Sequence, residues 1–370
     1  MASSLIQIRI ELYFGYTFDR LFYLLMIKGC MANRYFITLL SGLLCTCVAL
    51  WLYFVWQKPH MAESTQILTT TYDVKVVPGA IQPIPTLKAI DEQWVKLGRA
   101  LFHSPLLSKD NTISCASCHN INQGGDDGFP VSTGIDGQLG SRNSPTVLNA
   151  VFSFRQFWDG RSPDLADQAQ GPIHNPIEMG STFNEVINKL SKAPEFVATF
   201  ERLNPEGITS QAIIKALVTF EESLITPNAA IDRYLLGDSD ALTQQQKRGL
   251  EKFTSFGCVS CHQGVNIGGN LYQRLGRISE VPKKLLDDEG RFVLTQHKND
   301  QFVFKVPSLR NITLTAPYFH NGSVSGLEEA VTIMAKGQLG LDLSKQDIED
   351  LLALFEAFSG QLPNESGADK

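Results

Sequence analysis

The sequence predicts a mostly α-helical protein with two domains and long loops, preceded by a helix that spans a membrane. Apolar residues recur at helical spacing in several segments, whereas alternating strand patterns are scarce. A C-x-x-C-H motif occurs twice, 143 residues apart from His119 to His262, and similar segments precede both copies. Residues 35–56 carry no charge over 22 positions, which is long enough to cross a hydrocarbon core.

We expect residues 35–56 to form an uncleaved anchor in the inner membrane, behind an N-terminal extension over residues 1–34. Two basic residues precede the apolar segment closely and one follows it, so the charge bias favours a cytoplasmic N-terminus and an exported body. A cleaved signal peptide is the alternative, although no small-x-small cleavage site follows the apolar run. Translation from Met31 instead of Met1 is also open, because an export-like segment begins there.

The body is predicted to follow a tether over residues 57–88, which is polar and contains four prolines. The two domains are expected over residues 89–240 and 241–362, with a short tail over residues 363–370. Amphipathic helices are predicted over residues 89–102, 183–200 and 210–224. A helix with a G-x-x-x-F core precedes each C-x-x-C-H motif, from Gly98 to Phe102 and from Gly249 to Phe253. This weak repeat indicates one cofactor per domain.

The charge balance argues against a nucleic-acid partner. The formal net charge is -6 and the sequence pI is about 5.7, and no block of Lys and Arg is available to neutralise phosphates. The same balance suits a basic redox partner that docks weakly, and it also suits ordinary solubility.

The C-x-x-C-H motifs predict covalent attachment of two c-type haems. In this motif two thiols form thioethers to the haem vinyl groups, and the adjacent His lies under the iron as an axial ligand. The residues concerned are Cys115, Cys118, His119, Cys258, Cys261 and His262. A zinc site would need four ligands, and a His after both cysteine pairs would then be coincidence. The two domains are therefore expected to be cytochrome c-like haem domains, and haem attachment outside the cytoplasm predicts a periplasmic body.

The sixth ligand of each iron decides between electron transfer and substrate binding. Outside the two motifs, residues 89–362 contain four histidines and two methionines: His103, His174, His297, His320, Met179 and Met334. A Met ligand raises the reduction potential, so an iron with His and Met ligands would be the centre that accepts electrons. A lone Met at helical spacing is more often a core residue.

Four segments carry a resemblance to a known family: RNSPTVLNAVF at 142–152, FWDGR at 157–161, DQAQGPIHNPIEM at 167–179 and FKVPSLRNITLTAPYFHNG at 304–322. Over about residues 90–360 the chain resembles bacterial dihaem cytochrome c peroxidases and the related methylamine-utilisation-type dihaem enzymes. The resemblance implies reduction of hydrogen peroxide to water with electrons from a small protein, a cytochrome c or a cupredoxin. The first domain would hold the peroxidatic haem and the second the electron-transfer haem, and a homodimer is a candidate assembly.

The resemblance also implies individual roles. His262 and Met334 would be the axial pair of the second haem, Trp158 would lie between the haems, and Glu178, Gln168 and Pro172 would line the peroxide pocket. Asn143, Thr315 and Pro317 match a calcium site between the domains, a ligand set that suits a hard cation. The chemistry supports Glu178 separately, because peroxide cleavage needs a proton moved from the inner oxygen to the outer one.

One position departs from the resemblance. Many dihaem peroxidases have a His in an S-x-G-H-x-W stretch that caps the peroxidatic iron, whereas this chain has Ile135 there. Ile cannot bind iron, so we expect the first haem to be open at rest.

Two alternatives to the peroxidase function remain. The first is oxidation of a side chain on another protein, as in the methylamine-utilisation-type enzymes; Ile135 favours it, whereas Met334 does not, because those enzymes have a Tyr at that position. The second is a dihaem electron-transfer cytochrome, which would need both irons six-coordinate.

Overall fold

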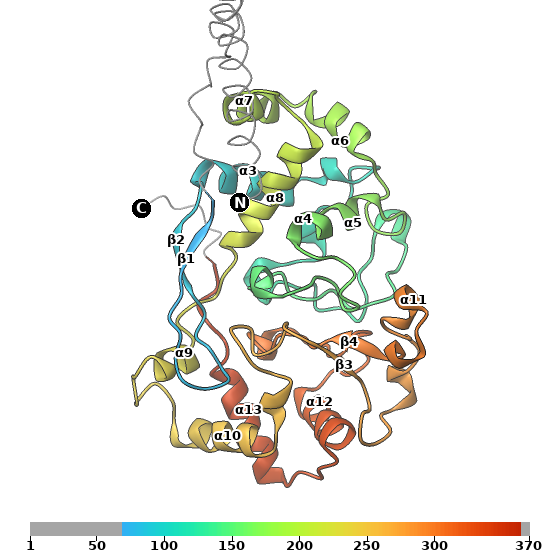
Figure 1. Cartoon of the computed structure of the whole chain (residues 1–370). Coiled ribbons are helices and arrows are strands. Elements are labelled where there is room, and N and C mark those ends of the chain that lie inside the picture. The colour runs from blue at the N-terminus through green and yellow to red at the C-terminus, as the bar shows by residue number, and fades with distance from the viewer. Residues whose placement is uncertain (1–68, 364–370) are drawn as a thin grey trace, which may run out of the picture. The chain divides into compact units, whose positions relative to one another are not determined.

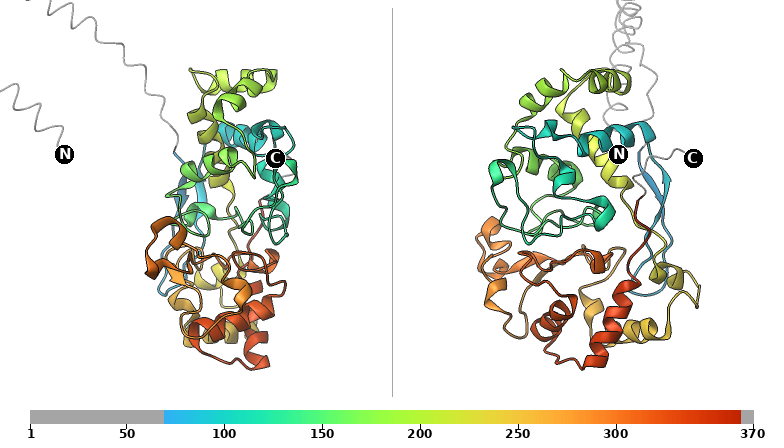
Figure 2. Two further views of the ribbon diagram at one scale, coloured as in Figure 1. Left: turned by 90° about the vertical axis from the view of Figure 1, so that its right-hand side faces the viewer. Right: turned by 180° about the vertical axis from the view of Figure 1, so that it is seen from behind.

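The computed structural model describes residues 69–363, and these form a predominantly helical body with two lobes (Figures 1 and 2). The first lobe contains α3 (Glu92–Phe102), α4 (Leu165–Gln168), α5 (Gln170–His174), α6 (Phe183–Leu190), α7 (Pro194–Leu203) and α8 (Ser210–Ser223). The second contains α9 (Ala230–Leu235), α10 (Gln244–Ser255), α11 (Phe292–Thr295), α12 (Leu327–Met334) and α13 (Lys345–Glu356). Two antiparallel pairs complete the body: β1 (Thr71–Asp73) with β2 (Thr86–Ala89), and β3 (Tyr272–Arg274) with β4 (Val303–Lys305).

Each lobe is built on one pair of tightly packed helices. In the first lobe Gly98 of α3 lies against α8, where an added Cβ would stand 1.9 Å from the Ala216 carbonyl oxygen. In the second lobe Gly249 of α10 lies against α13, where a Cβ would stand 2.1 Å from the Asp350 oxygen. The glycines of the G-x-x-x-F repeat are therefore close-approach sites between helices.

The helix predictions are partly confirmed. The helix expected over 210–224 is α8, and the helix expected over 89–102 begins later, because the Asp91 side chain accepts hydrogen bonds from the Gln93 and Trp94 amides and caps α3. The helix expected over 183–200 is two helices, α6 and α7. Pro194 occupies the first turn of α7 and cannot continue a helix from α6.

The part of the expected tether that the structure describes is ordered. Residues 69–89 form β1, β2 and the loop between them, and this hairpin runs beside both lobes (Figure 1). Ile81 is 5% exposed within the core of the second lobe, and the Ile84 amide donates to the Asp232 carboxylate at 3.2 Å. Buried apolar side chains and backbone pairing therefore order a segment that its proline content predicts as extended.

The expected membrane anchor over residues 35–56 lies outside the described residues. Within residues 69–363, the structure contains no helix long and apolar enough to span a bilayer.

Candidate active site

The first C-x-x-C-H motif is folded for haem attachment. Residues Cys115–Ser117 form a 3-10 turn, and both cysteines are free thiols that line one cavity together with His119. His119 Nδ1 lies 3.1 Å from the Gly125 carbonyl oxygen, which leaves Nε2 for a metal. Burial lowers the pKa of His119, so its imidazole is neutral, as metal ligation requires.

The second motif repeats this geometry in the other lobe. Residues Cys258–Ser260 form a 3-10 turn, and His262 Nδ1 lies 3.2 Å from the Ile267 carbonyl oxygen. Burial lowers the pKa of His262 to about 4. Both imidazoles are therefore fixed by a backbone carbonyl and kept neutral by desolvation.

The first cavity has a volume of about 720 Å³ and is lined by His119 and by all three predicted catalytic residues, Glu178, Gln168 and Trp158. The Glu178 carboxylate accepts a hydrogen bond from Asn175 Nδ2 at 2.6 Å. Burial raises the pKa of Glu178, while Asn175 and the Arg161 charge oppose that shift. A carboxyl group with a raised pKa in the cavity that His119 also lines is suited to moving a proton.

Ile135 is not among the described residues that line this cavity. Its side chain is 5% exposed and packs against Gly180, and its amide donates to the Glu178 carbonyl oxygen at 2.9 Å. Among the four remaining histidines, His174 is held by a 3.2 Å contact from Nδ1 to the Ser181 oxygen and by the Phe183 ring, also away from the cavity.

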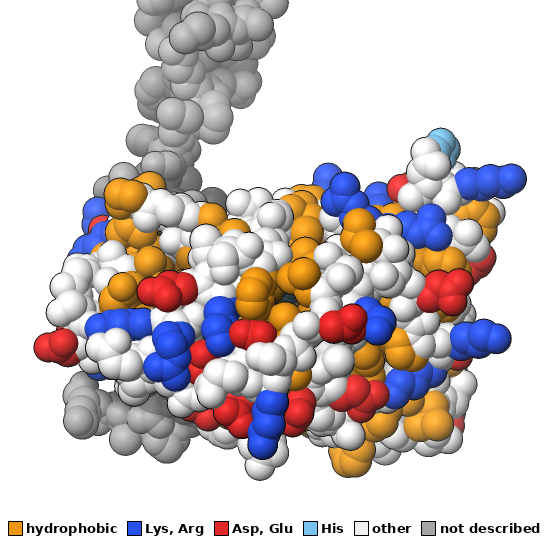
Figure 3. Space-filling model, turned by 90° about the horizontal axis from the view of Figure 1, so that it is seen from below, with side chains coloured by type: hydrophobic (Ala, Val, Ile, Leu, Met, Phe, Trp, Pro, Cys, Tyr) orange, Lys and Arg blue, Asp and Glu red, His pale blue; other side chains and the backbone are white. Residues whose placement is uncertain are grey.

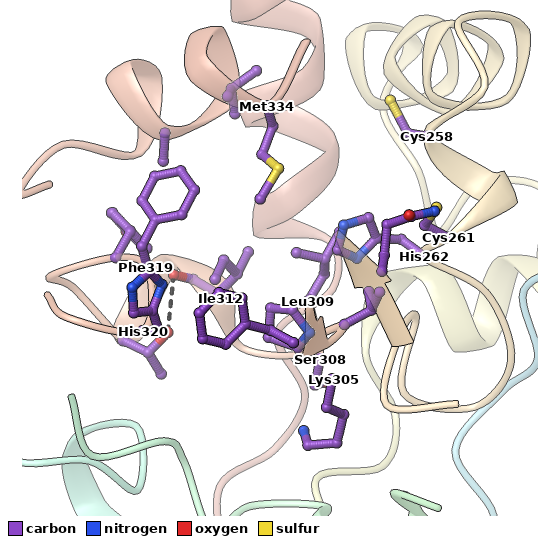
Figure 4. Close-up of a pocket in the computed structure, with 18 of the residues that line it drawn as sticks. Cys258, Cys261, His262, Lys305, Ser308, Leu309, Ile312, Phe319, His320 and Met334 are labelled. Carbon is purple, nitrogen blue, oxygen red and sulfur yellow. Dashed lines mark hydrogen bonds between the residues drawn. The ribbon is translucent and has the colours of Figure 1, made fainter. Parts of the chain in front are cut away.

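The second cavity is lined by Cys258, Cys261, His262 and Met334. Met334 ends α12 and is followed by a π-helical turn, Ala335–Leu339. Figure 4 shows its sulfur directed into the space that His262 faces. Most of the other lining residues are apolar, and Figure 3 shows apolar side chains gathered around a hollow on the lower face of the molecule. This arrangement fits a haem with one nitrogen and one sulfur ligand.

Trp158 lies in the wall that the two cavities share, because it lines both. Its Nε1 donates to the Asn143 carbonyl oxygen at 2.9 Å, and its own carbonyl accepts from the Lys305 amide at 2.8 Å. The indole is thus fixed between segments of both lobes, where the sequence predicts a residue lying between two haems.

The three predicted calcium ligands, Asn143, Thr315 and Pro317, line the second cavity together. Within the described residues no group of three or more His, Cys, Asp or Glu side chains is placed to hold a metal ion. Asp126 lies close enough to Tyr318, which follows Pro317, for its charge to act on that residue; it is 3% exposed, and its Oδ2 atom has no hydrogen-bond partner among the described residues. Burial raises the pKa of Asp126 to about 6.

Sequence reasoning missed an ionic cluster where the lobes meet. Arg142 contacts Asp159 at 2.5 Å and Asp288 at 2.6 Å. His320 stacks on the Phe304 ring with centroids 4.3 Å apart, and its ring also meets the edge of Trp158. Burial and the Arg142 charge lower the pKa of His320 to about 4, although Asp288 opposes the shift. The only signal in the sequence is that Arg142, Asp159 and His320 fall in segments that carry the family resemblance, and Asp288 has no such signal.

The residues of both cavities fit a covalently bound haem, since each brings together two thiols, a neutral imidazole with a free Nε2 atom and an apolar lining. Residues 92–240 match the family model described as "Di-haem cytochrome c peroxidase". The chain is 44% identical over 279 residues to the cytochrome c551 peroxidase of Pseudomonas aeruginosa, covering 74% of this chain and 81% of that protein. It is also 44% identical to the cytochrome c peroxidase Ccp of Escherichia coli over 286 residues, which are 76% of this chain and 61% of that protein.

A solved structure agrees with the fold. It is titled a MauG-like protein associated with microbial copper homeostasis; it is 27% identical, with a TM-score of 0.68, and the match covers 74% of this chain and 91% of that one. The present chain has two C-x-x-C-H motifs and two cavities that share a wall at Trp158. Together with these similarities, this shows that the chain belongs to the di-haem cytochrome c peroxidase family.

Proposed function

We propose that the protein reduces hydrogen peroxide to water with electrons from a small redox protein, a cytochrome c or a cupredoxin. One observation carries the proposal: two cavities with unlike ligand sets share a wall that contains Trp158. His119 would hold the haem at which peroxide reacts and His262 the haem at which electrons enter, and these groups would supply the redox chemistry when bound. Met334 closes the second site to substrate, and Trp158 provides the protein's bridge between the two.

Glu178 is proposed to move the proton during peroxide cleavage. Its carboxylate takes a proton from the inner peroxide oxygen and returns it to the outer one, which leaves as water. The 2.6 Å hydrogen bond from Asn175 orients the carboxylate, and burial brings its pKa upward toward working pH. Gln168 lines the same cavity and supplies an amide that can position the peroxide.

We propose that the first site is open at rest and needs no reductive activation. The position that carries a capping His in many related enzymes is occupied by Ile135, which is packed against Gly180 and hydrogen-bonded through its amide to the Glu178 backbone. No imidazole is therefore available from that loop to cap the iron. Electronic and EPR spectra of the oxidised protein should contain one high-spin and one low-spin haem, and two low-spin haems would contradict the proposal.

The decisive experiment replaces Glu178 with Gln in the mature protein. Turnover of peroxide with a reduced small cytochrome should fall by about two orders of magnitude or more if the carboxylate moves the proton. Haem content and the spectrum of the second haem should not change. Glu201→Gln, on the exposed side of α7, is the matched control and should retain full turnover. Undiminished turnover in Glu178→Gln would remove this residue from the mechanism.

A second candidate function is oxidation of a side chain on another protein, favoured by Ile135 alone. Met334 argues against it, because the methylamine-utilisation-type enzymes have a Tyr at that position. Steady-state peroxide turnover without prior reduction of the enzyme separates the two functions. A dihaem electron-transfer cytochrome is the non-enzyme alternative, and it requires a low-spin first haem.

We further propose that the body is exported and held to the inner membrane by residues 35–56, with a cleaved signal peptide as the alternative. A homodimer is the candidate assembly.

Calcium is proposed at Asn143, Thr315 and Pro317, supported by the unpartnered buried oxygen of Asp126 nearby. Chelation of calcium should lower peroxide turnover, and readdition of calcium should restore it. Turnover that is insensitive to chelation, with no metal found by elemental analysis, would contradict this site.

A further inference from the structure

Lys305 is a charged residue in an otherwise uncharged wall. Among the described residues that line the second cavity, it is the only Lys, Arg, Asp or Glu. It ends β4, and its side chain makes no hydrogen bond or ion pair within residues 69–363. Burial lowers the pKa of the Lys305 ammonium to about 8, with no neighbouring carboxylate to oppose the shift. The first cavity differs, since its arginines lie beside aspartates.

An unpaired ammonium inside a protein is expensive. Removing such a charge from water costs several kcal/mol unless an opposite charge or hydrogen-bond acceptors replace the lost solvent. Lys305 lines the cavity whose residues fit the second haem. A c-type haem brings an apolar ring and two ionised propionate carboxylates, so it supplies the missing counter-charge. None of the described residues that line this cavity is an Asp or a Glu.

The position of Lys305 also relates the haem to Trp158. The Lys305 amide donates to the Trp158 carbonyl oxygen at 2.8 Å, and both residues line the second cavity. Figure 4 shows Lys305 at one end of the group of residues drawn and Met334 at the other. A carboxylate paired with Lys305 would therefore lie beside the segment that carries the bridging indole, away from the sulfur ligand.

We propose that the Lys305 ammonium binds a propionate of the second haem, holds that edge of the ring beside Trp158 and raises the reduction potential of this haem. A positive charge next to the ring stabilises the reduced state, which carries one more electron. Lys305 is thus a positioning residue for electron entry. The inference rests on haem attachment at His262 and not on peroxide being the substrate, so its failure is distinguishable from failure of the proposed activity.

The test is a spectroelectrochemical titration of the mature dihaem protein, wild type against Lys305→Gln. The redox equilibrium of the second haem should shift at least tenfold toward the oxidised form, which is 59 mV for a one-electron couple. Lys305→Arg keeps the charge and should stay within threefold of the wild type. Lys336→Gln removes an exposed lysine two residues from Met334, and this control should leave the potential unchanged.

Two outcomes would overturn the inference. One is a Lys305→Gln protein with both haems attached, the Met-ligated spectrum intact and the wild-type potential. The other concerns the wild-type holoprotein and applies even if the variant fails to mature: a crystal structure in which Nζ of Lys305 lies beyond hydrogen-bond distance from both propionates. A structure with Nζ within 3.5 Å of a propionate oxygen would support it.

Discussion

Glu221 lies in the wall of the first cavity and should make the protein less stable as pH rises. It belongs to α8, is 6% exposed, and its carboxyl group has no hydrogen bond or ion pair within residues 69–363. Burial raises the pKa of Glu221 from 4.5 to about 8, and the charge of the adjacent Glu222 contributes further. The folded protein therefore holds a proton on Glu221 at neutral pH that the unfolded chain has released.

The sign and size of the change in unfolding free energy with pH follow from proton linkage at Glu221. Between the unfolded pKa of 4.5 and the folded pKa of about 8, the folded state binds more protons, so its stability falls as pH rises. Each pH unit in that window corresponds to about 1.4 kcal/mol for one group, so the change from pH 5 to pH 7.5 is roughly 3 kcal/mol. Below pH 4.5 this contribution is complete, and above pH 8 it is lost.

The assay is urea unfolding of the mature holoprotein at several pH values, wild type against Glu221→Gln. Gln has the shape of the protonated acid but does not titrate. The free energy of unfolding of the variant, minus that of the wild type, should therefore rise by roughly 3 kcal/mol between pH 5 and pH 7.5. Glu201→Gln is the control for loss of an exposed carboxylate. A difference between Glu221→Gln and wild type that stays constant with pH would refute the reasoning.

Three other perturbations test the region between the lobes. Arg142→Gln leaves Asp288 without its cation, whereas Asp159 keeps Arg161 at 3.1 Å, so urea unfolding should show a loss of about 3 kcal/mol; a loss under 1 kcal/mol would mean that solvent replaces the arginine. Met334→Leu removes the sulfur ligand, so the second haem should become high-spin with a lower potential, and an unchanged spectrum would exclude Met334 as ligand. His320, whose pKa is lowered to about 4, is neutral when folded, so its own contribution to stability should fall as pH drops from 6.5 toward 4, opposite to that of Glu221; the free energy of unfolding of His320→Gln minus that of the wild type should therefore rise over that range, and a constant difference would contradict the reasoning.

Local features of the fold could be predicted because they depend on neighbours in sequence. The periodicity of residues 210–224 identified α8, and the repeated G-x-x-x-F core identified α3 and α10. Helix periodicity continues on both sides of Pro194, so the periodicity alone does not reveal the break that the proline causes there. Residues 69–89 are ordered for a reason that their own sequence does not show. Their order depends on contacts with residues far along the chain, such as Ile84 with Asp232.

The residues of the candidate site also fall into those that the sequence predicts and those that only the structure reveals. Both haem motifs, Met334 and Glu178 could be named from the motifs or the family resemblance, and the structure places each of them on a cavity wall. Lys305 and Glu221 could not be singled out, because an isolated charge is unusual only once its surroundings are known to be buried. Lys305 even lies within a segment that carries the resemblance, but nothing in its neighbours along the chain indicates an unpaired ammonium.

The two cavities differ in the charge they offer, and the difference matches the division of labour proposed for them. The second cavity presents a single cation, Lys305, which favours an added electron. The first presents Glu221, whose pKa burial raises to about 8 so that it holds a proton at neutral pH, and Glu178, whose pKa burial also raises. Reduction of peroxide to water consumes electrons and protons together. Lys305 therefore favours electron entry on one side of Trp158, and the carboxyl groups supply protons on the other side, where reduction of peroxide consumes both.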